Sequence, residues 1–137
     1  MRYGLQMFGL NPIFLEDKEA FLKRITAAGY RYLEPRLMME PLPGAENRGW
    51  TEADFAENMP LLEKYGVKVH SCHVYSENIG EDLARIVEIV TRYGIRQIVI
   101  PCPADVNPAT AVYMTQVGDA LKKHGRRALF SADLELI

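Results

Sequence analysis

Two side chains suited to proton chemistry, Glu34 and His73, each stand at the end of a short apolar run. A carboxylate in such a place can bind a metal or sugar hydroxyls, or act as a general base. An imidazole can serve as a metal ligand, a hydrogen-bond donor or a proton shuttle. The structural alternatives are an ion pair between Glu34 and Arg31 or Arg36, and a packing role for His73.

The two cysteines, Cys72 and Cys102, offer a second candidate chemistry. We expect them at the ends of neighbouring strands, where two thiolates and one histidine would imitate a zinc site. The sequence has neither CxxC nor HxxxH spacing, so small buried residues are the favoured interpretation. Glycine-rich phosphate motifs and a GxSxG elbow are also missing, which argues against a nucleotide enzyme or a serine hydrolase.

A repeated unit must position these side chains. Four times an amphipathic stretch reaches a glycine and then enters a short apolar run, at Gly29, Gly66, Gly94 and Gly125. Glycine adopts the left-handed conformation that ends a helix, and the apolar run indicates a strand buried on both faces. The repeat predicts parallel βα architecture, in which ligands bind beyond the carboxyl ends of the strands.

The elements between these glycines follow from local signals. Thr51 with Asp54 is close to a capping box, and Asn107 precedes a proline at the start of the last helix. Pro60 is expected to kink or restart its helix, and the long loop over 36–50 is a candidate substrate cover. The pattern predicts a first strand over 3–8 and helices over 17–28, 51–65, 81–93 and 107–124.

Composition places the chain among ordinary globular proteins. Its 137 residues are 48% hydrophobic and 25% charged, with a net charge of −2, which fits one domain over 1–137. Near-neutral charge argues against nucleic-acid or membrane partners, and no apolar run approaches the roughly 18 residues of a membrane span. Without a signal peptide or a disulfide framework, a reducing cytoplasm is the expected compartment.

Several segments together resemble the sugar phosphate isomerases/epimerases, the xylose isomerase-like TIM barrels. The similarity lies in the order and spacing of a first strand, a helix followed by G-Y-x-x-hydrophobic-E, a third strand ending in histidine, and a fourth strand. These segments are residues 4–8, 21–34, 61–73 and 93–101.

The resemblance implies an isomerase or epimerase, or a related dehydratase, acting on a sugar, polyol or keto-sugar. A divalent metal (Mn, Mg, Co or Zn) would polarise the substrate oxygens while a carboxylate moves the proton. Glu34 and His73 match pocket positions of the first half of such barrels and are the candidate catalytic residues, and Asp133 is the candidate metal ligand. The candidate substrate contacts are Gln6, Phe8 and Cys102.

The chain is short for this family, because a complete barrel needs about 250 residues. We therefore expect a partial TIM barrel that stops after its fifth strand, with most metal ligands beyond this chain. An open doubly wound parallel sheet is the structural alternative. The functional alternatives are a non-catalytic sugar-binding remnant and a half-barrel that works only as a homodimer.

Overall fold

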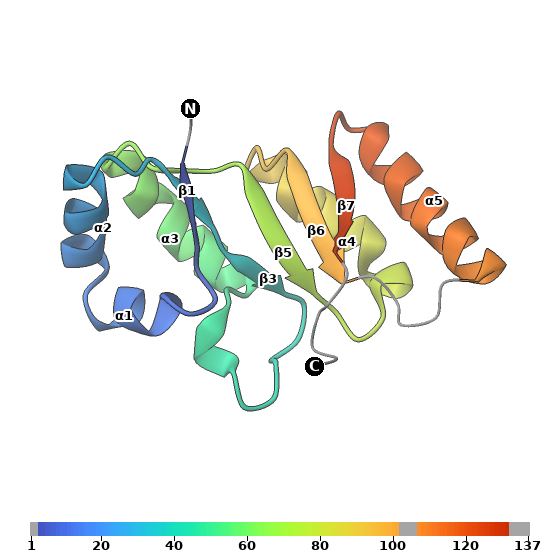
Figure 1. Cartoon of the computed structure of the whole chain (residues 1–137), viewed down its shortest axis with the longest axis horizontal. Helices are drawn as coiled ribbons and strands as arrows, with labels where there is room; N and C mark the ends of the chain where they lie inside the picture. The colour runs from blue at the N-terminus through green and yellow to red at the C-terminus, as the bar shows by residue number, and fades with distance from the viewer. Residues whose placement is uncertain (1–2, 102–106, 132–137) are drawn as a thin grey trace.

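Parallel strands alternate with helices throughout the computed structural model, which describes residues 3–101 and 107–131 (Figure 1). Every strand pairing between described residues is parallel, as the repeat predicts. The strands are β1 (Gly4–Gln6), β2 (Tyr32–Glu34), β3 (Arg36–Met38), β4 (Lys68–Val69), β5 (Ser71–Tyr75), β6 (Gln97–Pro101) and β7 (Arg127–Ser131).

Two single-residue breaks divide the strands between two sheets, ordered β1-β2-β4 and β3-β5-β6-β7. Only Pro35 separates β2 from β3, and only His70 separates β4 from β5. Proline has no N–H to donate to a ladder, which explains the first break. The hydrogen bonding between strands continues at this break, because His73 donates its N–H to the Pro35 carbonyl at 3.0 Å.

When β2 and β3 are counted as one strand and β4 and β5 as another, the strands lie side by side in chain order. A doubly wound sheet reverses its strand order at a switch point, whereas a barrel adds each new strand beside the previous one. The observed order is that of the predicted partial barrel, and the sheets are not closed.

The four glycines predicted to end helices all do so. Each has a positive φ, 94° at Gly29 and 68° at Gly66, Gly94 and Gly125. After each glycine, the next residue donates its N–H to the carbonyl five residues earlier, which closes the last helical turn. The helices ended in this way are α2 (Lys18–Ala27), α3 (Glu52–Lys64), α4 (Ile79–Arg92) and α5 (Pro108–Lys122).

Helix starts also follow the sequence signals. Thr51 and Asp54 form a complete capping box, and the Asn107 side chain caps α5 by accepting the Thr110 N–H at 3.0 Å. The expected restart at Pro60 is wrong, because α3 continues through it as one helix. A missing proline N–H removes one backbone hydrogen bond, a loss that the packing of α3 in the core offsets.

The N-terminal part departs from the predicted pattern. The first strand is shorter than predicted, and a helix that the pattern missed, α1 (Asn11–Glu16), precedes α2. The segment 36–50 is not a plain loop, because it holds β3 and the 3-10 turn η1 (Glu46–Arg48). Trp50 ties this segment to the sheet by donating its N–H to the Arg36 carbonyl at 2.7 Å.

One continuous core joins the helices to a single face of the sheet. Alternate strand residues such as Leu33, Val74 and Ile98 are fully buried in it. Their neighbours Glu34 and His73 lie on the other face and remain partly exposed, because successive strand side chains point to opposite faces. We call this second surface the helix-free face. Within the described residues, no helix is long and apolar enough to cross a membrane.

Candidate functional site

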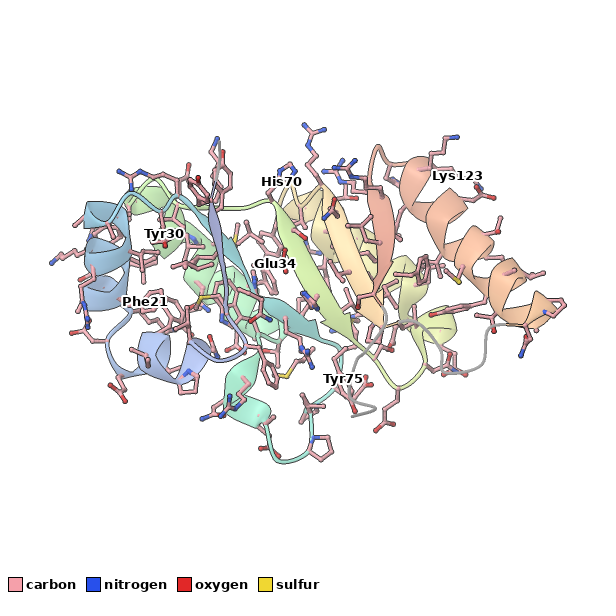
Figure 2. All side chains as sticks on the ribbon, viewed as in Figure 1. Phe21, Tyr30, Glu34, His70, Tyr75 and Lys123 are labelled. Carbon is pink, nitrogen blue, oxygen red and sulfur yellow. The ribbon has the colours of Figure 1, made fainter. Side chains whose placement is uncertain are left out.

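Glu34 and His73 form a hydrogen-bonded pair on the helix-free face. Glu34 is the last residue of β2 and His73 is the middle residue of β5. His73 Nε2 lies 2.9 Å from Glu34 Oε1, and the two side chains are 25% and 30% exposed. Figure 2 shows Glu34 at the centre of the sheet, away from both ends of the molecule. The structure thus brings together the two residues predicted to be catalytic.

Hydrogen bonding keeps the Glu34 carboxylate ionised. The hydrogen bond from His73 holds the pKa of Glu34 below its usual value, and a hydrogen bond from Ser71 adds to this effect. Partial burial acts in the opposite direction but is the weaker influence. Gln97 Nε2 lies 3.4 Å from Ser71 Oγ, so a polar row crosses three neighbouring strands.

The predicted alternative for Glu34, an ion pair with an arginine, is wrong. Arg31 donates to the backbone carbonyls of Thr26 and Tyr30. Arg36 lies over the ring of Phe8. The only ion pair of Glu34 within residues 3–101 and 107–131 is the one with His73.

A cavity of about 380 Å³ borders Glu34 on the helix-free face. Its size falls within the usual range of small-molecule sites. Glu34 and Ser71 contribute to its wall, and it extends toward the residues at which the strands begin. It is lined by Gly4, Tyr32, Leu33, Glu34, His70, Ser71 and Gln97.

The predicted substrate contacts Gln6 and Phe8 lie beside a second group of side chains. Gln6 pairs with Glu34 in the strand register, and its side-chain oxygen accepts the Phe8 N–H at 3.0 Å. Two guanidinium groups lie over the Phe8 ring, that of Arg36 at 4.4 Å and that of Arg48 at 5.4 Å from its centroid. Cations in this position are attracted by the ring face.

Arg36 and Arg48 are the residues near the site that the sequence analysis missed as functional candidates. The Arg36 Nε atom is buried and has no hydrogen-bond partner among the described residues. Strand alternation could have identified Arg36 from the sequence, since Glu34 and Arg36 share the helix-free face on either side of Pro35.

Cys72 has the structural role favoured by its sequence context. It is fully buried in the core, and burial raises the pKa of its thiol well above the usual range. The thiol therefore stays protonated and packs as a small apolar group. The other predicted site residues, Cys102 and Asp133, lie outside the described residues.

The described residues do not form a complete metal site. Within them, no group of three His, Cys, Asp or Glu side chains lies close enough to hold a metal. Glu34 and His73 together supply two donors, whereas catalytic zinc sites use three protein ligands. The divalent metal implied by the family resemblance therefore stays a prediction.

Comparison with known proteins supports the fold. No family model and no curated protein matches the sequence. A solved structure of a sugar phosphate isomerase/epimerase from Parabacteroides distasonis ATCC 8503 is similar, with a TM-score of 0.66 and 20% sequence identity. The similarity covers 94% of this chain and 50% of that protein.

The chain therefore shares its fold with half of this sugar phosphate isomerase/epimerase, as the sequence resemblance predicts. The chain spans half the length of the similar protein. In a complete barrel, the surface of the sheet that carries no helices is the one that the strands enclose.

Proposed function

We propose that this chain is part of an isomerase or epimerase that acts on a sugar, a polyol or a keto-sugar by moving a proton next to a carbonyl. The observation that carries the proposal is the 2.9 Å contact between an ionised carboxylate and an imidazole on the helix-free face. The fold shared with a sugar phosphate isomerase/epimerase supports the substrate class.

In this proposal the two side chains have different roles. A carboxylate whose pKa is lowered is a weak base, so the proposal assigns the proton transfer to the imidazole of His73. Because the Glu34 carboxylate accepts a hydrogen bond, Nε2 of His73 carries the proton and Nδ1 is the atom that exchanges one with the substrate. Glu34 fixes this tautomer and stabilises the imidazolium that forms. Its second carboxylate oxygen can accept a sugar hydroxyl.

A divalent metal remains part of the proposal. The described residues alone do not supply enough ligands to hold it. When bound, such an ion polarises neighbouring carbonyl and hydroxyl oxygens. With Nδ1 of His73 reserved for proton transfer, the pair leaves the Glu34 carboxylate as a metal donor, so further ligands, Asp133 among the candidates, would have to complete the site. The proton transfer assigned to His73 does not depend on this ion.

The test uses a substrate panel and a readout that needs no knowledge of the product. The protein is incubated in D₂O with aldose phosphates, ketose phosphates and the corresponding neutral sugars. Proton NMR then follows the loss of the hydrogen next to the carbonyl. The measurement is repeated after EDTA treatment and again after addition of Mn²⁺.

We expect exchange with the wild-type chain and a loss of about 100-fold or more in His73→Asn. Glu34→Gln should also lose activity, because the amide cannot stabilise an imidazolium. The matched controls are His124→Asn and Glu63→Gln, since both residues are exposed and neither lines the cavity beside Glu34. Equal exchange in His73→Asn and wild type would reject the proposal.

A homodimer of half-barrels is a second proposal, favoured by one observation. Leu129 on β7 is 46% exposed, and β7 has a single neighbouring strand among the described residues. Two copies that cover each other's open face would bury this surface.

If sugars bind in the NMR experiment without any proton exchange, the chain is instead a sugar-binding remnant.

A further inference from the structure

A hollow of about 760 Å³ lies at the edge of the sheet where the strands begin, away from the Glu34–His73 pair. It is framed by the starts of β4, β6 and β7 and by the turns that follow α4 and α5. Figure 2 shows the labelled His70 at this edge. Neither the proposed proton transfer nor the core uses the charged side chains around this hollow.

The lining is strongly basic although the whole chain carries a net charge of −2. It contains five cations and His70, and no Asp or Glu; the cations are Lys68, Arg96, Lys122, Arg126 and Arg127. None of the ion pairs between described residues involves any of these cations. Like charges gathered without counter-charges repel one another and attract anions.

One of the five cations is already engaged. Arg126 donates to the backbone carbonyls of Ile95 and His124 at 3.1 and 2.6 Å. The negative ends of α4 and α5 face this edge, each equivalent to about half an elementary charge. Arg126 therefore offsets these two helix ends, which leaves the charges of the other four cations unbalanced.

We propose that this hollow binds an oligophosphate, meaning a chain of linked phosphate groups. A single phosphate monoester carries at most about −2 at neutral pH, which is less than the four unbalanced cations. Three linked phosphates match that charge better, and the hollow has the volume of a small-molecule site. Arginine is suited to such a ligand because its guanidinium binds phosphate oxygens through two parallel hydrogen bonds.

Two sources supply this chemistry, the triphosphate of a nucleotide and inorganic tripolyphosphate. Isothermal titration calorimetry of the wild-type chain with ATP, tripolyphosphate and orthophosphate separates them. Equal affinity for ATP and tripolyphosphate would assign the site to the phosphate chain alone. Tighter binding of ATP would show that the nucleoside also contacts the protein. In both cases orthophosphate should bind more weakly, and added NaCl should weaken all binding.

The deciding variant is the double substitution Arg96→Gln with Arg127→Gln. Neither side chain makes a hydrogen bond or ion pair in the described structure, so the fold is expected to persist. We expect tripolyphosphate affinity to fall by at least about tenfold. Lys122→Gln is a milder second variant on α5 and should also weaken binding.

The matched control removes the same charge elsewhere. Lys23→Gln with Arg24→Gln changes two exposed cations on α2 and should leave the affinity unchanged. An equal loss in this control would show non-specific charge attraction and overturn the proposal. The proposal would also be overturned if the wild type bound neither ATP nor tripolyphosphate. Binding of a single-stranded oligonucleotide, without binding of either of these, would overturn it as well. Proton exchange at His73 is a separate readout, so failure here leaves the proposed function untouched.

Discussion

Glu34 and His73 meet diagonally across neighbouring strands rather than directly opposite each other. In the strand register His73 pairs with Arg36, two residues beyond Glu34, yet its Nε2 reaches Glu34 Oε1 at 2.9 Å. Diagonal neighbours in a sheet lie within reach of long side chains. The pair therefore depends on the backbone at Pro35, which separates β2 from β3 and sets the positions of Glu34 and Arg36 relative to β5.

The lowered pKa of Glu34 predicts a specific pH dependence of stability. Because the pKa is lower in the folded state than in the unfolded chain, ionised Glu34 stabilises the fold above the unfolded value of about 4.3. This contribution is lost as the pH falls through the folded pKa. The difference in unfolding free energy between wild type and Glu34→Gln should therefore shrink as the pH falls below about 5. Urea denaturation at several pH values measures it.

Comparison with a second variant isolates this effect from the other carboxylates. Glu63→Gln removes an exposed carboxylate for which the structure gives no ion pair or hydrogen bond. The difference in unfolding free energy between wild type and Glu63→Gln should stay constant over the same pH range. A difference for Glu34→Gln that grew toward low pH would contradict the assigned direction of the pKa shift.

A buried hydrogen bond between Asn11 and Trp50 predicts a large loss of stability in Asn11→Ala. Trp50 Nε1 donates to Asn11 Oδ1 at 2.7 Å, and both residues are 1% exposed. Removing the amide leaves the indole N–H buried without a partner, at a cost of about 1–3 kcal/mol. Urea unfolding followed by the fluorescence of Trp50, the single tryptophan of the chain, gives the value.

Asn47→Ala is the matched control, because Asn11 Nδ2 donates to the Asn47 backbone carbonyl and not to its side chain. It should leave stability within about 0.5 kcal/mol of wild type. Similar losses in the two variants would mean that the turn, rather than the buried hydrogen bond, is the sensitive feature.

Gly49 is required by space and not by backbone conformation. Its backbone is extended, but an added Cβ would lie 2.7 Å from Met38 Cγ and 3.0 Å from the Arg36 carbonyl oxygen. Met38 is buried and has little room to move. Gly49→Ala should destabilise the chain by about 1–3 kcal/mol. Gly9→Ala, where a Cβ meets open space, should have little effect; equal losses would refute the steric explanation.

Elements defined by local chemistry were predictable from the sequence. The glycine that ends α4, Gly94, needs only a residue that tolerates positive φ. The capping box at Thr51 needs only a hydroxyl and a carboxylate three residues apart. By contrast, α1 has six residues and is too short to be stable alone. It is held by Phe14, whose ring lies 5.5 Å from those of Phe21 and Trp50.

The sequence singled out Glu34 and His73 but not the contact between them. Alternation along the strand places Ser71 and His73 on one face, and the end of the preceding run exposes Glu34. Their hydrogen bond depends on the register between strands that are distant in the sequence, which no local pattern encodes. The same reason hid β3, since Pro35 indicates a loop until β5 is known to lie beside it.

Leu129 provides a test of association through the helix-free face. This side chain is 46% exposed on β7, and its strand partner is Val99 on β6. If two copies cover each other there, light scattering should give the mass of a dimer for the wild-type chain. Leu129→Lys should shift it to a monomer, because burying an unpaired ammonium group is costly.

Leu15→Lys is the matched substitution, since Leu15 is 44% exposed but belongs to helix α1 rather than to a strand of the sheet. It should leave the dimer intact if the helix-free face is the interface. A wild-type chain that is monomeric and well folded would exclude the half-barrel dimer. The isomerase proposal would then rest on the Glu34–His73 pair within one chain, and proton exchange by the monomer would become the decisive measurement.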